Sequence, residues 1–153
     1  MLSDKEFDWF LNTFGQPEHS VPAADQVIKK FRERLPNRLL EYWKAYGFCG
    51  FGNGLLWLVN PDQYEFAIDE WLDDTPVVEE DAFHVIARSA FGSLFLWGTK
   101  TGYRYELDCP RGWIVQQDGN SAAIAEGRAD IALARFFAIR RKDHARWWRR
   151  SLA

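Results

Sequence analysis

Lysine and arginine are missing from a long central part of the chain. No basic residue occurs between Ala45 and Ala87, a stretch of 43 residues that carries nine carboxylates. The formal net charge of −3 for the whole chain therefore combines a segment at −9 with a remainder at +6. A surface of one sign steers and discriminates charged partners, although it says little about fold. This segment is the first candidate for a partner-binding surface.

Cysteine and long apolar runs are also scarce. Cys49 and Cys109 are the only cysteines and stand far apart, so we expect two buried free thiols rather than a disulfide. No window approaches the roughly 18 consecutive apolar residues that a membrane helix needs. Residues 1–10 carry neither a basic leader nor an uninterrupted apolar stretch. We therefore expect a cytoplasmic protein that does not contact a membrane.

Motifs of known catalytic or metal chemistry are missing as well. His19, His84 and His144 lie far apart in sequence, and none has a cysteine or carboxylate at a recognised metal spacing. The glycines at 50, 52 and 54 precede an apolar run and are followed by no lysine of a phosphate loop, which favours a turn over a nucleotide site. No nucleophile elbow occurs. The sequence does not exclude a catalytic pair of one cysteine and one histidine that the fold brings together. We expect no enzyme activity, no cofactor and no metal.

What the chain does have is apolar and aromatic side chains. Hydrophobic residues make up 47% of the 153 residues and aromatic residues 16%, which is ample surface for a core. The length fits one domain. We expect a single compact unit over 1–153, composed of a helical part at 1–75, a β-meander part with a final helix at 76–139, and a basic aromatic tail at 140–153.

The spacing of apolar residues predicts helices first and strands afterwards. Ser3 and Glu6 have the spacing of a capping box at the start of the first helix. Helices are predicted at 4–13, 25–34, 36–46, 61–73 and from 130 onward, and strands at 55–59, 83–88, 94–97, 103–107 and 113–115. This order predicts an α+β fold in which N-terminal helices are followed by an antiparallel β-meander and a C-terminal helix.

The acidic residues gather on the predicted helix at 61–73 and on the segment behind it. Like charges four residues apart oppose an isolated helix by roughly 0.2–0.5 kcal/mol per pair, so packing must hold this one. One interpretation is a face that only keeps the protein dispersed, and the other is a docking face for a basic partner. Trp71 is a candidate anchor for a partner if it lies outside the core. The candidate partner-binding residues are Glu65, Asp69, Asp73, Asp74, Glu79, Glu80 and Asp81.

Basic and aromatic residues alternate in the tail between Arg140 and Arg150. Such interleaving is typical of contacts with nucleic acid or an anionic membrane. A solvated helix end, whose cations complement the helix dipole, is a second interpretation, and packing on the chain's own acids is a third. The net acidity of the chain makes nucleic-acid binding the weakest of the functional hypotheses.

Several blocks of the sequence resemble a known family, the GAD-like domain. They are FGQP at 14–17, VP at 21–22, LP at 35–36, LLEYWKAYGF at 39–48 and NGLLWLVNP at 53–61. Further on, FHVIARSAFG at 83–92 and LFLWG at 94–98 look like the domain that follows it in immunity proteins of bacterial type VI secretion systems. Together the blocks indicate a likeness over roughly 14–137.

The resemblance implies a non-enzymatic cytoplasmic protein that binds and neutralises a cognate secreted toxin encoded nearby, a DNase in the best-known relatives. It also implies an SMI1/KNR4-like fold and stoichiometric inhibition. Most matched residues are apolar, glycine or proline, so they imply a scaffold and do not identify the toxin-binding face. A regulatory or interaction module of the same fold is the alternative, and the oligomeric state stays open.

Overall fold

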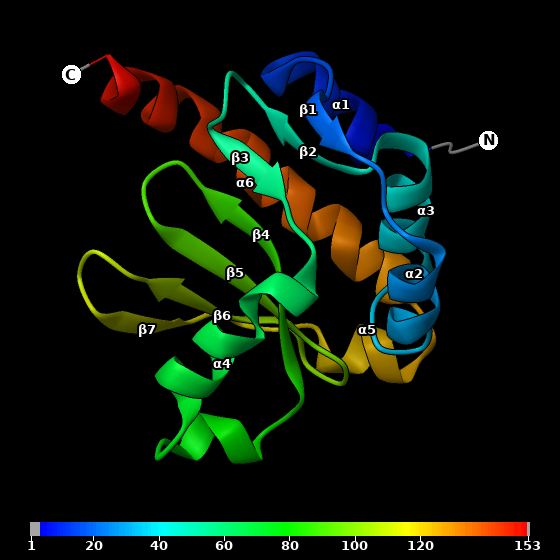
Figure 1. Cartoon of the computed structure of the whole chain (residues 1–153), viewed down its shortest axis with the longest axis vertical. Coiled ribbons are helices and arrows are strands. Elements are labelled where there is room, and N and C mark those ends of the chain that lie inside the picture. Colours follow the sequence, from blue (N-terminus) through cyan, green and yellow to red (C-terminus); the bar gives the residue numbers. More distant parts are fainter. Residues whose placement is uncertain (1–3, 153) are drawn as a thin grey trace.

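In the computed structural model, which describes residues 4–152, one antiparallel sheet of seven strands carries helices on both faces (Figure 1). Each strand pairs with the next in chain order. The strands are β1 (Glu18–Val21), β2 (Phe48–Phe51), β3 (Leu56–Leu58), β4 (Phe83–Ser89), β5 (Ser93–Gly98), β6 (Gly102–Asp108) and β7 (Trp113–Gln116). The helices are α1 (Lys5–Phe14), α2 (Asp25–Phe31), α3 (Asn37–Tyr46), α4 (Glu65–Leu72), α5 (Ser121–Ala125) and α6 (Ala129–Ser151), with 3-10 turns η1 (Pro61–Tyr64) and η2 (Pro76–Glu79).

The order of these elements corrects the expected fold class. The predicted SMI1/KNR4-like order, N-terminal helices and then a separate meander, is wrong because strands already occur among the first helices. β1 lies between α1 and α2, and the β2–β3 hairpin follows α3. β3 pairs with β4 at Leu58 and Ala87, so the early strands extend the later meander into one open sheet. The protein is α+β with its strands spread over most of the chain.

The two strands absent from the predictions, β1 and β2, lack the signals on which a prediction depends. All four residues of β1 are exposed, so no alternation of apolar and polar residues marks it. β2 contains Gly50, a residue that is depleted in strands, and the helix-ending Gly47 comes just before it. Both strands exist because their backbones pair with each other, from Glu18 opposite Gly50 to Val21 opposite Phe48.

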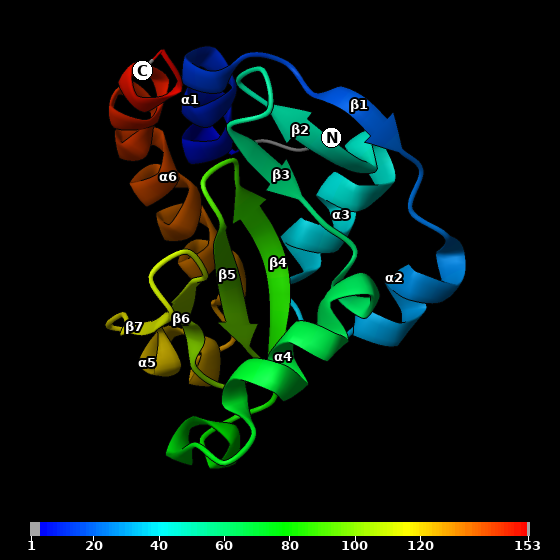
Figure 2. The ribbon, with the colours of Figure 1, turned by 60° about the vertical axis from the view of Figure 1, so that its left-hand side comes forward.

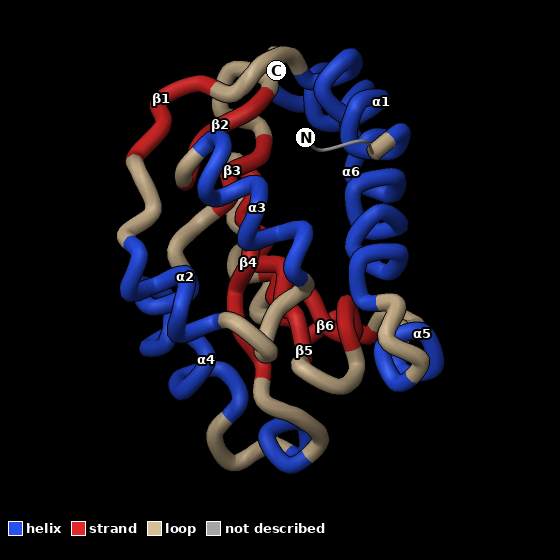
Figure 3. The backbone as a smooth tube through the Cα atoms, turned by 90° about the vertical axis from the view of Figure 1, so that its right-hand side faces the viewer, coloured by secondary structure: helices blue, strands red, loops and turns tan. Residues whose placement is uncertain are grey.

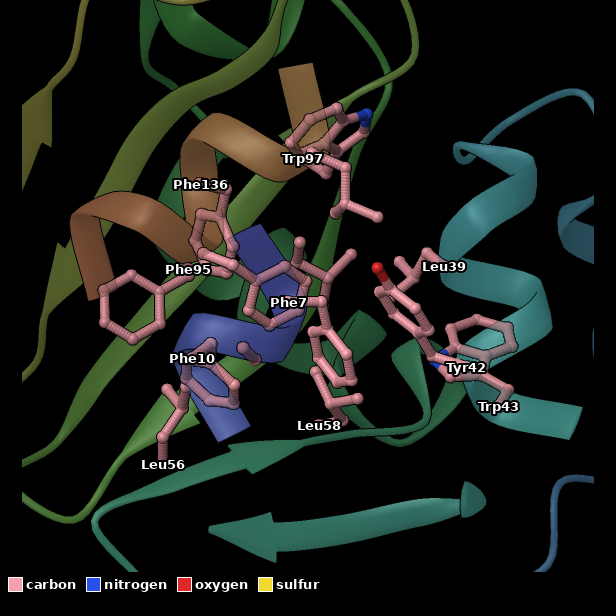
Figure 4. Close-up of a cluster of buried hydrophobic side chains, with 14 of the residues drawn as sticks. Phe7, Phe10, Leu39, Tyr42, Trp43, Leu56, Leu58, Phe95, Trp97 and Phe136 are labelled. Atoms are coloured by element: carbon pink, nitrogen blue, oxygen red, sulfur yellow. The ribbon is translucent and has the colours of Figure 1, made fainter. Parts of the chain in front are cut away.

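The larger core lies between the sheet and the helices α1, α3 and α6 (Figure 3). It is built largely from aromatic rings, and Figure 4 shows Phe7 and Phe10 of α1 pointing toward Tyr42 of α3 and Phe136 of α6. Phe7 stacks on Tyr42 with ring centroids 4.0 Å apart. Stacked and edge-on pairs of this kind add to the free energy gained by burial. This core ties the two ends of the chain together.

The N-terminus of α1 is held by a carboxylate rather than by the predicted Ser3, which lies outside the described residues. Asp4 is the N-cap, and its Oδ1 accepts a hydrogen bond from the backbone N–H of Phe7 at 3.2 Å. Its other oxygen accepts from the Tyr42 hydroxyl and lies 3.4 Å from the Arg38 guanidinium. The cap therefore also docks α1 on α3.

A smaller core lies on the opposite face of the sheet, beneath α4. Leu72 of α4 packs there with Val85, Leu96 and Leu107 of the central strands. Neighbouring positions on β5 alternate between the two cores, since Phe95 and Trp97 belong to the larger and Leu94 and Leu96 to the smaller. The like-charged helix is thus held by packing.

The cysteines differ from each other. Cys49 is a buried free thiol as predicted, and burial raises its pKa to about 12. Cys109 is also free but exposed, which corrects the prediction that both are buried. It lies in the turn between β6 and β7, where no core reaches it.

Candidate protein-binding surface

The helix α4 and the two residues after it hold four of the seven acidic candidates. Ala67 and Leu72 are buried, and Ile68 and Trp71 pack against the smaller core with part of their surface covered. The opposite face of the helix is left to solvent. Trp71 therefore contributes to the core and is not the free aromatic anchor considered from the sequence.

The solvent-facing side of α4 combines four carboxylates with one aromatic ring. Phe66 is 67% exposed. A shallow hollow of about 520 Å³ is lined by Phe66, Asp69, Glu70, Asp73 and Asp74. None of the four carboxylates takes part in an ion pair or a side-chain hydrogen bond within residues 4–152. We name these five residues the α4 acidic face.

Phe66 was not among the residues predicted from the sequence. The signal that could have identified it is helical spacing, because positions 66, 69, 70 and 73 are separated by three, four and seven residues. Phe66 therefore belongs on the face of the acids, whereas Trp71 belongs with Ile68 on the packed side. An exposed ring beside unpaired charge combines an aromatic anchor with the polar rim of a protein interface.

The end of α4 is electrostatically unfavourable on its own. Its last turn contains acids and no basic residue, although the C-terminus of a helix favours cations. Asp74, just past the helix, has a φ of 62°, a left-handed conformation that costs most residues free energy but that Asp and Asn tolerate. Cationic groups of a partner would lower the repulsion between these carboxylates and the negative end of the helix.

In the second group of candidates, Glu80 and Asp81 are engaged within the protein, whereas Glu79 is exposed and forms no ion pair within residues 4–152. Asp81 Oδ2 accepts hydrogen bonds from the backbone N–H groups of Lys100 and Thr101 at 2.9 and 2.8 Å, and from the Thr101 hydroxyl at 2.8 Å. It closes the β5–β6 turn. A Cβ on Gly98 would overlap this carboxylate, which explains the glycine there.

Basic residues from other parts of the chain compensate much of the remaining acidity. Glu80 accepts from the Tyr105 hydroxyl and lies 4.0 Å from Arg104 Nε, and Asp62 pairs with Lys30. Arg34 and Lys100 join Glu79, Glu80 and Asp81 around a hollow of about 610 Å³. Lysine and arginine from elsewhere in the chain thus pair with Asp62 and Glu80 and line the hollow beside Glu79 and Asp81, whereas no ion pair reaches the α4 acidic face within residues 4–152.

Glu65, the first candidate on α4, faces inward to His84. Its Oε1 lies 3.4 Å from His84 Nδ1, and the imidazole is 7% exposed with its edge against the Phe31 ring. Burial lowers the pKa of His84, and the charges of Arg34 and Lys30 act in the same direction while Glu65 opposes them. Glu65 therefore contacts the buried His84 although its side chain is 42% exposed, and it does not line the hollow of the α4 acidic face.

The Arg/Trp-rich tail is the second half of α6, a continuous helix of 23 residues. It does not pack on the acids of 62–81, because α4 and the C-terminal end of α6 lie at opposite ends of the molecule (Figure 2). Arg140 and Trp147 are buried in the larger core, while Arg141 lies over the Trp9 ring. Part of the tail is therefore structural.

Two further features concern the described residues as a whole. Within residues 4–152, no helix is both long enough and apolar enough to cross a membrane. The same residues contain no group of three or more His, Cys, Asp or Glu side chains that could hold a metal ion.

The fold and this surface define an α+β protein with an open antiparallel sheet and one uncompensated acidic face. The GAD-like domain model matches residues 5–111, which is more than half of the chain, and the chain belongs to the GAD-like domain family. No curated protein matches the chain significantly.

One solved structure similar to this chain is that of Atu4351 from Agrobacterium tumefaciens. The two superpose with a TM-score of 0.70 and share 20% sequence identity, over 86% of this chain and 59% of that chain. This chain thus corresponds to less than two thirds of that protein. At this level of identity the likeness concerns the fold alone.

Proposed function

We propose that this protein is an immunity protein, which binds a cognate type VI secreted toxin in the cytoplasm and neutralises it by stoichiometric inhibition without catalysis. Membership of the GAD-like domain family supports this proposal, because the family's domain occurs in toxin immunity proteins. We further propose that the toxin is a DNase and that it is encoded beside the immunity protein.

The observation that carries the proposal is the α4 acidic face. A nuclease presents a cationic surface to the phosphates of DNA, and a cluster of unpaired carboxylates is complementary to such a surface. Asp69, Glu70, Asp73 and Asp74 supply that charge, and Phe66 supplies exposed apolar area beside them. Charge speeds encounter, whereas a buried ring slows dissociation, so the face holds both parts of a tight interface.

The test uses the neighbouring gene product as toxin. Co-expression, co-purification and a nuclease assay measure whether a stoichiometric complex forms and whether DNA cleavage stops. We expect a complex whose association rate falls as salt rises, because the Debye length shrinks from about 10 Å at 0.1 M to about 3 Å at 1 M.

Charge reversal locates the interface. The variant Asp69→Lys, Asp73→Lys, Asp74→Lys should lower the association rate constant by tenfold or more, within the roughly 10–10³ range of electrostatic steering. The helix should persist because these changes remove like-charge repulsion. A control variant with Glu18→Lys, Glu41→Lys and Asp118→Lys makes the same charge change at exposed positions on other elements. Equal affinity and salt dependence for the two variants would contradict an interface at the α4 acidic face.

A further inference from the structure

A second polar hollow lies at the other end of the molecule from α4. It has a volume of about 270 Å³ and is enclosed by the second half of α6, the β4–β5 turn and the β6–β7 turn. Arginine side chains at positions 111, 140, 146 and 150 line it, together with Glu106, Asp108 and Asp143. The ring of Phe91 and the buried Trp147 complete the wall. We name it the arginine hollow.

The carboxylates of the arginine hollow already have partners within the protein. Glu106 accepts hydrogen bonds from the Tyr103 hydroxyl at 3.2 Å and from the Ser93 hydroxyl at 3.1 Å. Asp143 lies 3.1 Å from Arg140 Nε and 3.0 Å from an Arg146 amino group. Asp108 lies 3.4 Å from both the backbone nitrogen and an amino group of Arg111. These contacts face both oxygens of all three carboxylates, so the hollow has few acceptors left for a ligand.

The cationic donors are only partly used. Arg140 is 4% exposed and lies among the rings of Phe95, Tyr103 and Phe136, with its guanidinium carbon 4.4 Å from the Phe95 centroid. One amino group donates to the Tyr103 hydroxyl at 3.0 Å, but its buried Nε has no aligned hydrogen bond, although Asp143 is close. A buried donor without a hydrogen bond costs free energy unless a ligand or water supplies an acceptor.

A cation without an acidic partner within the described chain stands at the mouth of the hollow. Arg150 lies over the Phe91 ring, 4.4 Å from its centroid, and forms no ion pair with a carboxylate in the described part of the chain. Arg111 and Arg146 flank the opening with 63% and 69% of their side chains exposed, and each has one amino group paired, with Asp108 at 3.4 Å and with Asp143 at 3.0 Å. The lining carries four arginines against three acids. The lining therefore carries one more positive than negative charge, and Arg150 is the arginine that no lining acid compensates among the described residues.

We propose that the arginine hollow binds a small phosphate-bearing anion, a phosphate monoester in chemical class. Guanidinium groups bind phosphate through paired, charge-assisted hydrogen bonds, and the hollow has these donors left over. Its volume is at the low end of small-molecule sites, which admits a phosphate with a short substituent rather than a macromolecule. The site is separate from the α4 acidic face, and the proposal does not depend on toxin binding.

The test uses inorganic phosphate and glycerol phosphate as probes, with sodium chloride at equal ionic strength as reference. We expect saturable binding by calorimetry and a matching rise in melting temperature, since a ligand of the folded state stabilises it by RT ln(1 + [L]/Kd). Arg150→Gln and Arg146→Gln should each weaken binding by about tenfold. Both side chains are exposed, so these variants should fold. Arg149→Gln, an exposed neighbour that does not line the hollow, is the matched control and should bind as the wild type does.

Two results would overturn the proposal. The first is any failure of specific binding: neither probe binds saturably, or all three variants bind the probes as tightly as the wild type does. The second is retention on vesicles containing phosphatidic acid without any binding of the free probes, which would show that the arginines read a membrane surface instead. Binding of the free probes that Arg150→Gln and Arg146→Gln weaken and Arg149→Gln leaves unchanged would support the proposal.

Discussion

Phe66 is the residue on which we expect the tightness of toxin binding to depend. Its ring is exposed in the free protein, so Phe66→Ala should leave the free energy of unfolding within about 0.5 kcal/mol of wild type. If the ring is buried in the complex, the same change should cost about 2 kcal/mol or more of binding free energy, mainly as faster dissociation. Surface plasmon resonance with the toxin measures this. Val21→Ala removes another exposed apolar side chain, on β1, and an equal loss for both variants would refute the assignment.

His84 should make stability depend on pH. Burial lowers its pKa in the folded state below the ordinary value of about 6.5, so the unfolded chain takes up a proton first as pH falls. The contribution of this histidine is fully present above pH about 6.5 and is lost as pH falls toward the pKa of the folded state. Urea denaturation between pH 7 and pH 5 should show a falling free energy of unfolding.

The histidine variants separate this effect from general acid sensitivity. His84→Gln should flatten the pH dependence between pH 7 and pH 5, even though it also lowers stability by losing the contact with Phe31. His19→Asn changes an exposed histidine with a φ of 53°, a conformation that Asn tolerates, and should keep the wild-type slope. Identical slopes for the two variants would assign the pH dependence to other groups.

Among the structural elements, the β5–β6 hairpin depends on one carboxylate. Asp81→Ala removes the acceptor for two backbone N–H groups and the Thr101 hydroxyl, so we expect a loss of about 1–3 kcal/mol in the free energy of unfolding. Asp69→Ala on α4 removes a carboxylate with no partner and should change stability by less than about 0.5 kcal/mol. Chemical denaturation of both variants gives the comparison. A similar stability for the two would mean that the turn does not need its carboxylate.

At the scale of the whole molecule, the end of α6 belongs to the fold. Truncation after Ile139 removes Arg140 and Trp147 from the larger core, and we expect a loss of several kcal/mol or failure to fold, because burying one large apolar side chain alone contributes about 1.5–3 kcal/mol. Circular dichroism with urea titration measures this. Replacing the exposed Lys142 and Arg149 by Gln should leave the fold intact, as a control on charge. A truncated chain as stable as the wild type would contradict the structural role of the tail.

The whole molecule also separates its charges. The α4 acidic face and the arginine hollow occupy opposite ends, with the sheet and its two cores between them (Figure 2). One end is suited to a cationic partner and the other to an anion. Because the two surfaces lie far apart, their opposite charges do not neutralise each other within the chain. This separation follows from the placement of the two helices. α4 follows strand β3 and covers the smaller core on one face of the sheet, whereas α6 packs against α1 and covers the larger core on the other face.

The sequence by itself determined the elements that carry local signals. Apolar spacing predicted α1, α3 and the start of α6, and period-two alternation predicted the strands from β4 to β7, because both patterns are written in neighbouring residues. The same reading found the acids of α4 and the block of residues that marks the family. It could not find β1, whose existence depends on pairing with β2 rather than on its own side chains.

The tertiary structure alone decided which charged groups are free. Asp69 and Asp81 belong to one acidic segment of the sequence, yet Asp81 is fixed by the β5–β6 turn while Asp69 has no partner among the described residues. Lys30 and Arg104 come from distant parts of the chain and pair with Asp62 and Glu80, acids that have no basic neighbour in sequence. Coulomb interactions act through space and fall off with distance, so the order of residues along the chain cannot show which charges cancel.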